Sequence, residues 1–407
     1  MPSHRRKRRE KPAKPYPSFP LTAHNNGQWC KKIRGRIHFF GVWEDPQTAL
    51  DSYFRQAADL HAGRQPRPST LSADALTVKD VCNEYLTHQF RKVEAGEIGP
   101  RWLEDCRRVA ECFAAFMGKS RLVEDIRPDD FQRFRRKLVR EGLKAGGRGL
   151  GVDGLTRAIT VVRGMLKYAY DTDLLDRPMK FGRAFDKPSA SVKRKARRDA
   201  VLRNGKRLFS AAEVRAMIEK AGIPLKAMIF LGINGGFGNT DCARLSRRGV
   251  DLENQLVEFA RPKTGIERVI PLWDETAQAL RESLTQRPKP ASREHEDLVF
   301  LTTFGRPWLR QRVDREVHEG NVRVVTVDAV RQEFHKLLKK LGVARKGVGF
   351  YALRHTFRTW ADETKDQHAI HRIMGQEIPG MSGIYVETVG IDRLRAVTDH
   401  VHDWLYQ

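Results

Sequence analysis

The sequence predicts a mainly helical protein with small β elements, an α+β fold class divided among several domains. Apolar residues recur with helical spacing from residue 76 to about 175. Short runs of β-forming residues flank turns in two places, around Arg34-Gly35-Arg36 and between residues 256 and 272. The chain has 407 residues, of which 40% are hydrophobic, so it can bury a sizeable core and is long enough for two or three domains.

The charge balance is strongly basic, with 75 Lys and Arg against 50 Asp and Glu, for a formal net charge of +25. Such an excess repels itself in a compact state, which favours a polyanionic partner. Nucleic acid fits because Lys and Arg release condensed counterions from phosphates. A ribosomal-type or merely soluble basic protein is the other interpretation of the composition. No long uncharged apolar run is present, so no membrane partner is expected.

The cysteines and the N-terminus indicate a reducing compartment. Five cysteines form no CxxC pair and no secreted-type framework, which predicts a cytoplasmic protein. The basic start of the chain is not followed by an apolar stretch of signal-peptide length. Export is therefore not expected.

Residues 1–20 are expected to form a disordered basic arm, because proline and like-charge repulsion both oppose packing. Its basic run is Arg5, Arg6, Lys7, Arg8 and Arg9. A simple solubility tail is the alternative. Residues 21–65 then predict a small module, with two strands around Arg34-Gly35-Arg36 and a helix from Pro46 to about His61. The composition of residues 65–75 is typical of a linker.

Residues 76–175 predict four helices, the last two separated by the glycine-rich stretch 145–151. Several arginines of this block are expected on its surface, where they suggest contact with a nucleic-acid duplex. They are Arg101, Arg107, Arg108, Arg133, Arg135 and Arg136. A solvated helix face is the alternative for each one taken alone.

Residues 176–207 predict a basic linker between domains. Five cations lie close together without a helical apolar stripe: Lys193, Arg194, Lys195, Arg197 and Arg198. We interpret the segment as extended chain that follows a phosphate backbone. A nuclear-import-like signal is the alternative, relevant only in a eukaryote.

Residues 208–407 predict a mixed α/β domain. Ser210 and Glu213 form a capping box that opens its first helix. An apolar helix follows over residues 225–233, then a hairpin of residues 256–259 with 268–272, and helices are expected to dominate from there to the C-terminus. Residues 392–405 have an amphipathic helical pattern.

The motifs of this last domain, in their order, resemble the catalytic domain of the tyrosine recombinases, the phage integrase family. In that family a helical region carries an arginine, a hairpin presents a lysine, a helix carries His-x-x-Arg, a Gly-His or Gly-Trp step follows, and a tyrosine is the nucleophile. The block at 76–175 resembles the family's core-binding domain, and residues 21–65 resemble the arm-type DNA-binding modules of integrases. The C-terminal amphipathic helix resembles the segment that recombinases dock onto a neighbour, and packing on its own domain is the alternative.

The resemblance assigns chemistry to three residues. Tyr385 stands where the family has its nucleophile, which attacks a phosphodiester and stores the bond as a phosphotyrosine. Arg354, in Tyr-x-Leu-Arg-His-Thr-Phe, matches the arginine that binds oxygens of the scissile phosphate. Lys263 matches the hairpin lysine that protonates the leaving 5′-oxygen. A structural aromatic and a solvated turn lysine are the alternatives for Tyr385 and Lys263.

Three positions depart from the family pattern. Gly238 replaces the first arginine, Tyr351 replaces the first histidine, and Gln376 follows Gly375 in place of histidine or tryptophan. Tyr351 and Gln376 can still hydrogen-bond a phosphate oxygen. Loss of the arginine removes a charged clamp worth about 3–4 kcal/mol. Three arginines lie near enough in the sequence to substitute for it: Arg244, Arg261 and Arg268. Otherwise the enzyme is slow or inactive.

The resemblance implies a site-specific recombinase or integrase of a mobile genetic element, which cleaves and rejoins DNA through a 3′-phosphotyrosine. Its implied partners are double-stranded DNA and further copies of the chain, as a tetramer on DNA, and its location is cytoplasmic and nucleoid-associated. No cofactor and no metal are expected, since His368 and His371 have no third ligand. The alternatives are a catalytically impaired, site-specific DNA-binding factor of the same fold and a relaxing enzyme of the type IB topoisomerase kind.

Overall fold

The computed structural model describes residues 11–61, 76–144, 146–316, 321–378 and 388–407. The chain divides into two compact units, one of Met1–Lys193 with Arg315–Arg323 and one of Arg194–Asp314 with Val324–Gln407. In the described ranges, no helix is both long and apolar enough to span a bilayer.

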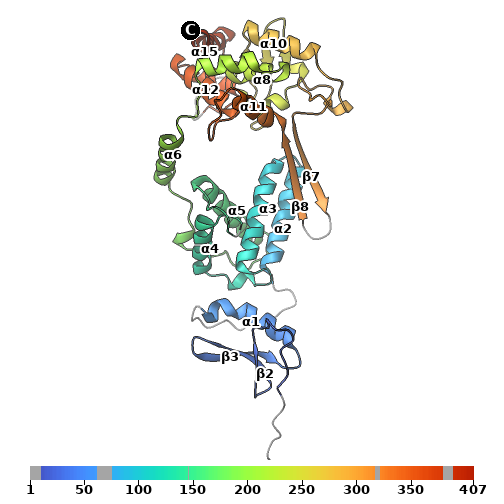
Figure 1. Ribbon diagram of the computed structural model, residues 1–407, viewed down its shortest axis with the longest axis vertical. Helices are drawn as coiled ribbons and strands as arrows, with labels where there is room; N and C mark the ends of the chain where they lie inside the picture. The colour runs from blue at the N-terminus through green and yellow to red at the C-terminus, as the bar shows by residue number, and fades with distance from the viewer. Residues whose placement is uncertain (1–10, 62–75, 145, 317–320, 379–387) are drawn as a thin grey trace, which may run out of the picture. The chain divides into compact units, whose positions relative to one another are not determined.

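The N-terminal part of the first unit is a three-stranded antiparallel sheet with one helix. Its elements are β1 (Thr22–His24), β2 (Gln28–Ile33), β3 (Arg36–Val42) and α1 (Pro46–His61). Arg34 and Gly35 turn the hairpin with φ of 50° and 85°, the positive values that a two-residue connection of this kind requires. The predicted hairpin and helix are therefore confirmed (Figure 1).

Ordered packing starts earlier than the sequence predicted. Phe19 is only 2% exposed and its ring meets Trp29 edge to face, so it belongs to the small core beneath the sheet. Lys14 donates a hydrogen bond to the carbonyl of Phe19. The C-terminal end of the segment predicted as a disordered arm is thus packed onto the module, because one aromatic side chain is enough to tie it there. The basic run Arg5–Arg9 lies outside the described residues.

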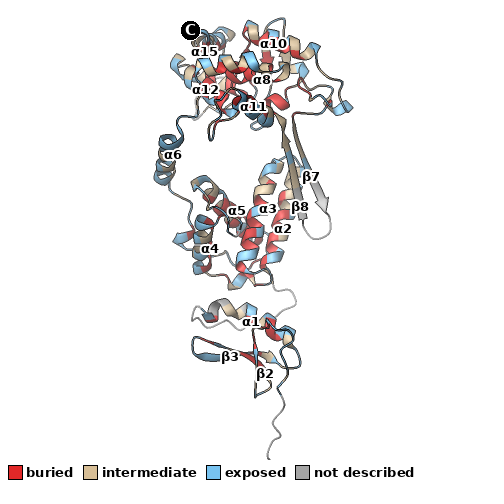
Figure 2. Cartoon of the chain, viewed as in Figure 1, coloured by how far each residue is buried: buried red, intermediate tan, exposed pale blue. Residues whose placement is uncertain are grey.

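The four helices predicted from residue 76 onward are present. They are α2 (Val78–Glu94), α3 (Pro100–Met117), α4 (Pro128–Arg140) and α5 (Val152–Asp171), with a short 3-10 turn, η1 (Val123–Asp125), before α4. Each helix buries one apolar face (Figure 2). The apolar spacing in the sequence is the cause, since residues three and four apart lie on one side of a helix.

Several of the arginines assigned to a duplex already have partners in the protein. Arg107 pairs with Glu104 and Glu111, and Arg133 pairs with the buried Asp130. Arg135 donates to the carbonyl of Asp186. Residues 76–175 therefore have fewer arginines without a partner in the protein than the sequence suggested.

The basic linker is not extended. After a short 3-10 turn, η2 (Arg183–Phe185), residues Ala190–Asn204 form helix α6, in which no residue is buried. Figure 2 shows this helix without a buried face, and Leu202 is 78% exposed. The prediction of extended chain was wrong because it took the lack of an apolar stripe as evidence against a helix. Most residues here are good helix formers, and a helix can form without such a stripe.

We expect α6 to be marginal by itself. A peptide of residues 186–207 should show weak helical ellipticity at 222 nm in low salt, because a helix of 15 residues without a packed face is near its stability limit and clustered cations repel. Helicity should rise when duplex DNA neutralises the cations. A control peptide with Lys193 and Arg197 changed to Glu should gain helix in water and not respond to DNA. Strong helicity of the native peptide in low salt would contradict this.

The second unit surrounds one large hydrophobic core. Its helices are α7 (Ala211–Lys220), α8 (Ile223–Asn234), α9 (Asn239–Ala243), α10 (Asp274–Thr285), α11 (Ala329–Lys340), α12 (Tyr351–Ala361), α13 (Gln367–Met374) and α15 (Ile391–Tyr406). Short 3-10 turns lie at η3 (Arg247–Gly249), η4 (Arg293–His295) and η5 (Asp362–Thr364). The predicted capping box opens α7, where Ser210 and Glu213 each accept a backbone N–H.

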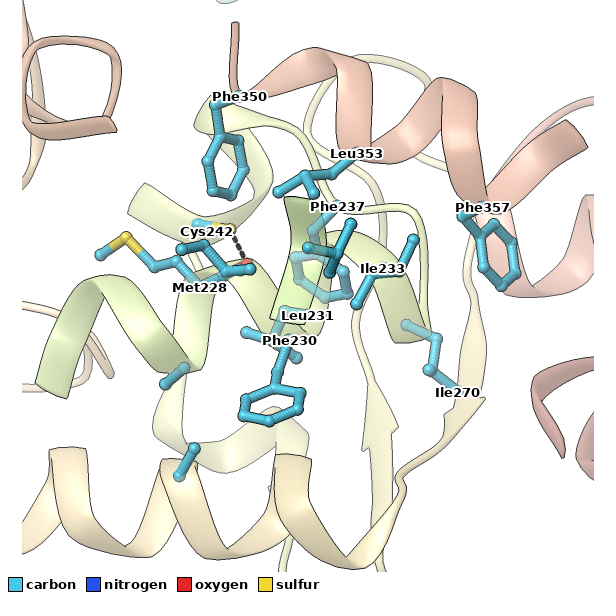
Figure 3. Close-up of a cluster of buried hydrophobic side chains, with 14 of the residues drawn as sticks. Met228, Phe230, Leu231, Ile233, Phe237, Cys242, Ile270, Phe350, Leu353 and Phe357 are labelled. Atoms are coloured by element: carbon cyan, nitrogen blue, oxygen red, sulfur yellow. Dashed lines mark hydrogen bonds between the residues drawn. The ribbon is translucent and has the colours of Figure 1, made fainter. Parts of the chain in front are cut away.

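Helix α8 is the centre of this core. Nine of its 12 residues are buried, and it packs against α10 and α12. Figure 3 shows Phe230, Leu231 and Ile233 of α8 among Phe237, Ile270 and Leu353 from neighbouring segments. An all-round apolar helix is expected to lie in a core rather than on a surface.

After residue 245, the described residues form two small sheets. β4 (Val250–Asp251), β5 (Leu256–Glu258) and β6 (Val269–Pro271) form one in that order, and the β5–β6 pair is the hairpin that the sequence predicted. β7 (Leu309–Glu316) and β8 (Asn321–Asp328) pair as the other. The sequence prediction missed this second hairpin and expected helices. The β-branched run from Val322 to Val327 was the available strand signal.

The C-terminal helix α15 packs on its own domain. Leu394, Val397, Val401 and Leu405 are each 1% exposed or less and belong to the same core as α8. Trp273 donates its ring N–H to the carbonyl of Thr398, and Trp360 stacks on Trp404. The sequence left open docking onto a neighbouring copy or packing on its own domain, and the structure has the helix packed on its own domain.

All five cysteines are free and buried: Cys30, Cys82, Cys106, Cys112 and Cys242. Burial raises the pKa of Cys82 and of Cys106 to about 12. Burial also raises the pKa of Cys242 well above its usual value. These three thiols are protonated at neutral pH.

Candidate functional site

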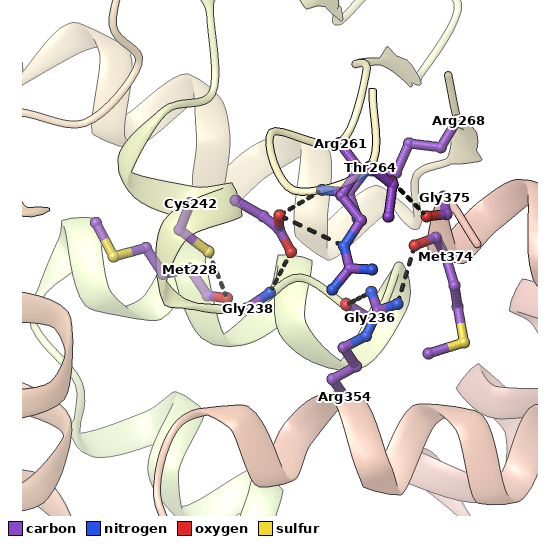
Figure 4. Close-up of polar contacts among 11 residues, drawn as sticks. Met228, Gly236, Gly238, Cys242, Arg261, Thr264, Arg268, Arg354, Met374 and Gly375 are labelled. Atoms are coloured by element: carbon purple, nitrogen blue, oxygen red, sulfur yellow. Dashed lines mark hydrogen bonds and ion pairs between the residues drawn. The ribbon is translucent and has the colours of Figure 1, made fainter. Parts of the chain in front are cut away.

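Four segments of the second unit meet beside the core. They are the loop from α8 into α9, the loop between β5 and β6, the second turn of α12, and the end of α13 (Figure 4). Gly236 carries a positive φ of 64°, and a Cβ there would lie 3.1 Å from the Phe357 ring, so glycine is required where the first loop passes α12.

Arg354 is held in place by two hydrogen bonds to backbone carbonyls. Its side chain is buried, and its two terminal nitrogens donate to the carbonyls of Gly236 (2.5 Å) and Met374 (3.0 Å). Burial and the neighbouring Arg261 lower its pKa, while Tyr351 and Asp241 oppose the shift. The two carbonyls join three segments of the chain through one guanidinium group.

Arg268 lies still deeper, with no exposed surface at all. Its guanidinium stacks on the rings of Phe237 (4.0 Å to the centroid) and Phe259 (5.5 Å). Within the described residues none of its three nitrogens has a hydrogen-bond partner, and Asp241 Oδ1 lies 3.5 Å away. Burial lowers its pKa to about 10, with Asp241 opposing, so the group stays charged at neutral pH.

Arg261 lies in the loop between β5 and β6 and is 8% exposed. Its Nε lies 3.9 Å from Asp241 Oδ1. Figure 4 shows its guanidinium pointing toward that of Arg354. The second oxygen of Asp241 accepts the backbone N–H of Gly238 at 2.8 Å.

The cluster has an unbalanced charge. Three guanidinium groups, those of Arg261, Arg268 and Arg354, surround the single carboxylate of Asp241. Buried charges are normally paired, because leaving water costs several kcal/mol per ion. A cluster with surplus positive charge at its edge is suited to receive an anion.

Tyr351 stands beside the position that lacks the family's arginine. A Cβ at Gly238 would lie 3.1 and 3.2 Å from two ring carbons of Tyr351. Tyr351 itself is 47% exposed and meets His355 edge to face. Burial, Arg207 and Arg354 lower the pKa of His355, so that imidazole is neutral at neutral pH.

Lys263 is exposed in the β5–β6 loop, and among the described residues it makes no hydrogen bond or ion pair with the cluster. The loop is held at the next residue, where Thr264 donates to the carbonyl of Gly375 at 3.2 Å. Gly375 has a φ of 57°, and a Cβ there would lie 3.0 Å from Cβ of Arg261. Gln376 is half-buried, and its backbone N–H donates to the carbonyl of His371.

The structure brings together three of the arginines that the sequence singled out. Arg261, Arg268 and Arg354 form one cluster, and Arg244 does not join it, because it is exposed at the end of α9. Tyr385 lies outside the described residues. The linker cations from Lys193 to Arg198 lie on α6.

Sequence reasoning missed the part played by Asp241 and the two phenylalanines. Asp241 is the third residue of α9 and caps the helix through the N–H of Gly238. An acid three residues after a glycine at a helix start was a usable signal for the cap. Nothing in the sequence indicated that Phe237 and Phe259 would cover Arg268. Across the described ranges, no three potential ligands gather as a metal site.

Residues 203–389 match the phage integrase family. No curated protein matches the chain. Among solved structures, the Tn1549 transposon integrase (residues 82–397) in complex with a circular intermediate DNA has a TM-score of 0.53 at 15% identity, covering 80% of this chain and 99% of that one.

The lambda integrase structures match over a longer part of the chain. The dimer bound to a COC′ core site has a TM-score of 0.52 at 15% identity, covering 93% of this chain and 98% of that one. The tetramer bound to a Holliday junction has a TM-score of 0.53 at 14% identity, covering 93% and 99%. Residues 203–389 therefore match the phage integrase family, and the chain has the fold of the Tn1549 and lambda integrase structures.

Proposed function

We propose that the protein is a site-specific DNA recombinase of the integrase type, which cleaves and rejoins duplex DNA through a 3′-phosphotyrosine on Tyr385. The observation that carries the proposal is the buried cluster of Arg261, Arg268 and Arg354 around one carboxylate, inside a phage integrase domain. Surplus buried cations at the edge of a site fit a phosphodiester, whose charge grows in the transition state.

The chemistry needs three functions. The hydroxyl of Tyr385 gives up its proton to water as its oxygen attacks the scissile phosphorus, and the bond from phosphorus to the 5′-oxygen breaks. Arg354 hydrogen-bonds the non-bridging oxygens, with the N–H groups that its two carbonyl partners leave free. Lys263, exposed in its loop, gives a proton to the leaving 5′-oxygen. The phosphotyrosine is reversed by a 5′-hydroxyl, so no nucleotide is consumed.

The remaining parts of the chain supply the DNA contacts. We assign residues 1–20 as a basic arm, 21–65 as an arm-type module, 76–175 as the core-binding domain, 176–207 as the basic linker and 208–407 as the catalytic domain. The partners are a duplex recombination site of a mobile genetic element and further copies of the chain. Each cut strand needs its own nucleophile, and two duplexes have four strands, so strand exchange calls for a homo-tetramer. Its location is the cytoplasm, on the nucleoid.

A second candidate function rests on Gly238. With glycine at the position of the first arginine, the chain is a non-catalytic factor that binds a specific DNA site and does not cut it. The fold and the basic surface support both functions equally, and only chemistry separates them.

The test is covalent trapping with the full chain. Duplexes that bind the protein are selected from a random-sequence pool and rebuilt with a nick close to the cleavage site. The short fragment that carries the 5′-hydroxyl then diffuses away after cleavage, so the reaction cannot reverse. The recombinase proposal expects a covalent protein–DNA adduct whose DNA maps to a tyrosine-containing peptide. Tight, sequence-specific binding without any adduct would instead establish the DNA-binding factor.

Arg354→Ala should lower the single-turnover rate of adduct formation by about 10²–10³-fold, the effect of losing one preorganised donor to a developing charge. Duplex affinity should hardly change, because one phosphate contact among many is lost. Gel analysis of the adduct against time measures the rate, with anisotropy for affinity. Arg281→Ala, an exposed arginine of α10, is the matched control. An unchanged rate for Arg354→Ala would remove this residue from the chemistry.

Deletion of residues 1–20 should weaken duplex binding and flatten its salt dependence. Each phosphate contact that is lost lowers the slope of log K against log salt by ~0.9. Fluorescence anisotropy across a range of salt concentrations measures the slope. A deletion of residues 1–10 alone is the control for the packed residue Phe19. If the slope is the same with and without the arm, the arm is only a solubility tail.

A further inference from the structure

We propose that Arg261 makes the phosphate contact that the family's first arginine makes elsewhere, so that the clamp has moved from the start of α9 to the β5–β6 loop. This inference rests on the proposed recombinase function. It answers a question that the sequence left open, namely which of Arg244, Arg261 and Arg268 replaces the arginine absent at Gly238.

The original position is crowded by the Tyr351 ring. A Cβ at Gly238 would lie 3.1 Å from the Tyr351 ring and 3.5 Å from Asp241 Oδ2, and contacts below about 3.4 Å require the neighbour to move. Asp241 is also engaged there, accepting the N–H of Gly238. A side chain at this point would require the Tyr351 ring to shift by a few tenths of an ångström.

Two of the three candidates fail on exposure. Arg268 has no exposed surface and lies under the rings of Phe237 and Phe259, so a phosphate cannot reach it. Arg244 is exposed at the end of α9 and is absent from the cluster. A phosphate clamp must be largely desolvated yet reachable, because charge–charge attraction is strong only where water is excluded.

Arg261 meets both conditions. It is 8% exposed, and in the described part of the chain its guanidinium makes no hydrogen bond; its Nε is fully buried and its nearest carboxylate oxygen is 3.9 Å away. It points toward Arg354, and burial together with this neighbouring cation lowers the pKa of Arg354; two like charges this close repel each other (Figure 4). An anion bound between the two guanidinium groups is attracted by both, and this attraction offsets their mutual repulsion.

The surroundings hold Arg261 in this orientation. Gly375, without a side chain, leaves room for Cβ of Arg261, and Thr264 ties the loop to the carbonyl of Gly375. The same loop carries Lys263 two residues further on. One loop thus brings both a phosphate clamp and the proton donor to the scissile phosphate.

The test compares single-turnover cleavage by the full chain on the nicked duplex for wild type, Arg261→Ala and Arg261→Lys, with Arg281→Ala as the matched control. Arg261→Ala should lose about 10²–10³-fold in rate, as for any single charged clamp. Arg261→Lys should recover only part of it, because an ammonium cannot bind two oxygens as a planar fork does. Duplex affinity and the urea midpoint of each variant are measured alongside, so that unfolding is not read as lost chemistry.

A neutral substrate separates a phosphate contact from a structural role. A methylphosphonate at the scissile position carries no negative charge on its non-bridging oxygen, so the defect of Arg261→Ala relative to wild type should shrink on it. A variant that merely distorts the site would keep the same defect on both substrates, and that result would overturn the proposal.

Gly238→Arg gives an independent outcome. If Arg261 already holds the phosphate, the added side chain crowds Tyr351 and lowers cleavage. A rise of about two orders of magnitude, worth about 3 kcal/mol, would show that the clamp had stayed vacant and would overturn the proposal. Cleavage by wild type and equally by Arg261→Ala would also overturn it while leaving the recombinase function intact. Absence of any adduct from wild type would instead overturn the recombinase function itself.

Discussion

Replacing Tyr385 by phenylalanine should abolish the covalent protein–DNA adduct and leave duplex binding unchanged. The substitution removes one hydroxyl group, and that oxygen is the atom proposed to join phosphorus. The ring remains, so any packing of the side chain is retained. Denaturing gels with labelled nicked duplex measure the adduct, and anisotropy with the same duplex measures binding.

The control is Tyr170→Phe, at a tyrosine of α5 that is 40% exposed. It should form the adduct at the wild-type rate. An adduct that persists in Tyr385→Phe would assign the nucleophile to another residue. Loss of binding together with the adduct would show instead that the hydroxyl contributes to the DNA complex as a whole.

Asp241→Ala should destabilise the second unit by about 3–5 kcal/mol, the range for removing one partner of a buried ion pair. Asp241 supplies the carboxylate nearest to the fully buried Arg268 and also accepts the N–H of Gly238. Without it, Arg268 stays charged in an apolar surrounding and the start of α9 loses its cap. Urea unfolding followed by tryptophan fluorescence measures the free energy of unfolding.

A second variant shows whether the cost comes from the orphaned charge. Asp241→Ala combined with Arg268→Met should be more stable than Asp241→Ala alone, since replacing both partners of a buried pair by apolar groups is often nearly neutral. Asp362→Ala breaks the exposed pair with Arg358 and should cost about 1 kcal/mol or less. Equal losses for Asp241→Ala and Asp362→Ala would mean that solvent reaches the cluster and screens it.

Periodicity was sufficient for elements whose apolar residues face one core. Helices α2 to α5 and the hairpin of β5 with β6 were predicted because each carries a clear period of helix or strand. Helix α6 was not predicted, because it buries no residue against the described part of the chain, and its sequence accordingly has no apolar stripe. The β7–β8 hairpin was hidden by its charged residues, which are unusual in strands.

The residue types of the candidate site could be predicted from the sequence, but the degree to which each arginine is buried could not. The sequence treated Arg244, Arg261 and Arg268 alike, since arginine is usually at a surface. Tertiary packing separates them into an exposed, a nearly buried and a fully buried residue. In the same way, the apolar stripe of α15 required a covering surface, but a stripe cannot say whether that surface belongs to the same chain.

The burial of every cysteine has a practical consequence for labelling chemistry. A maleimide dye reacts with an accessible thiolate, and the native thiols are covered, with burial raising the pKa of Cys82, Cys106 and Cys242. A cysteine introduced at an exposed position, such as Leu202 of α6, would therefore be the preferred target for a dye in the otherwise native chain. Pairs of such positions, one in each unit, would report by fluorescence transfer how the two units move when they bind a duplex.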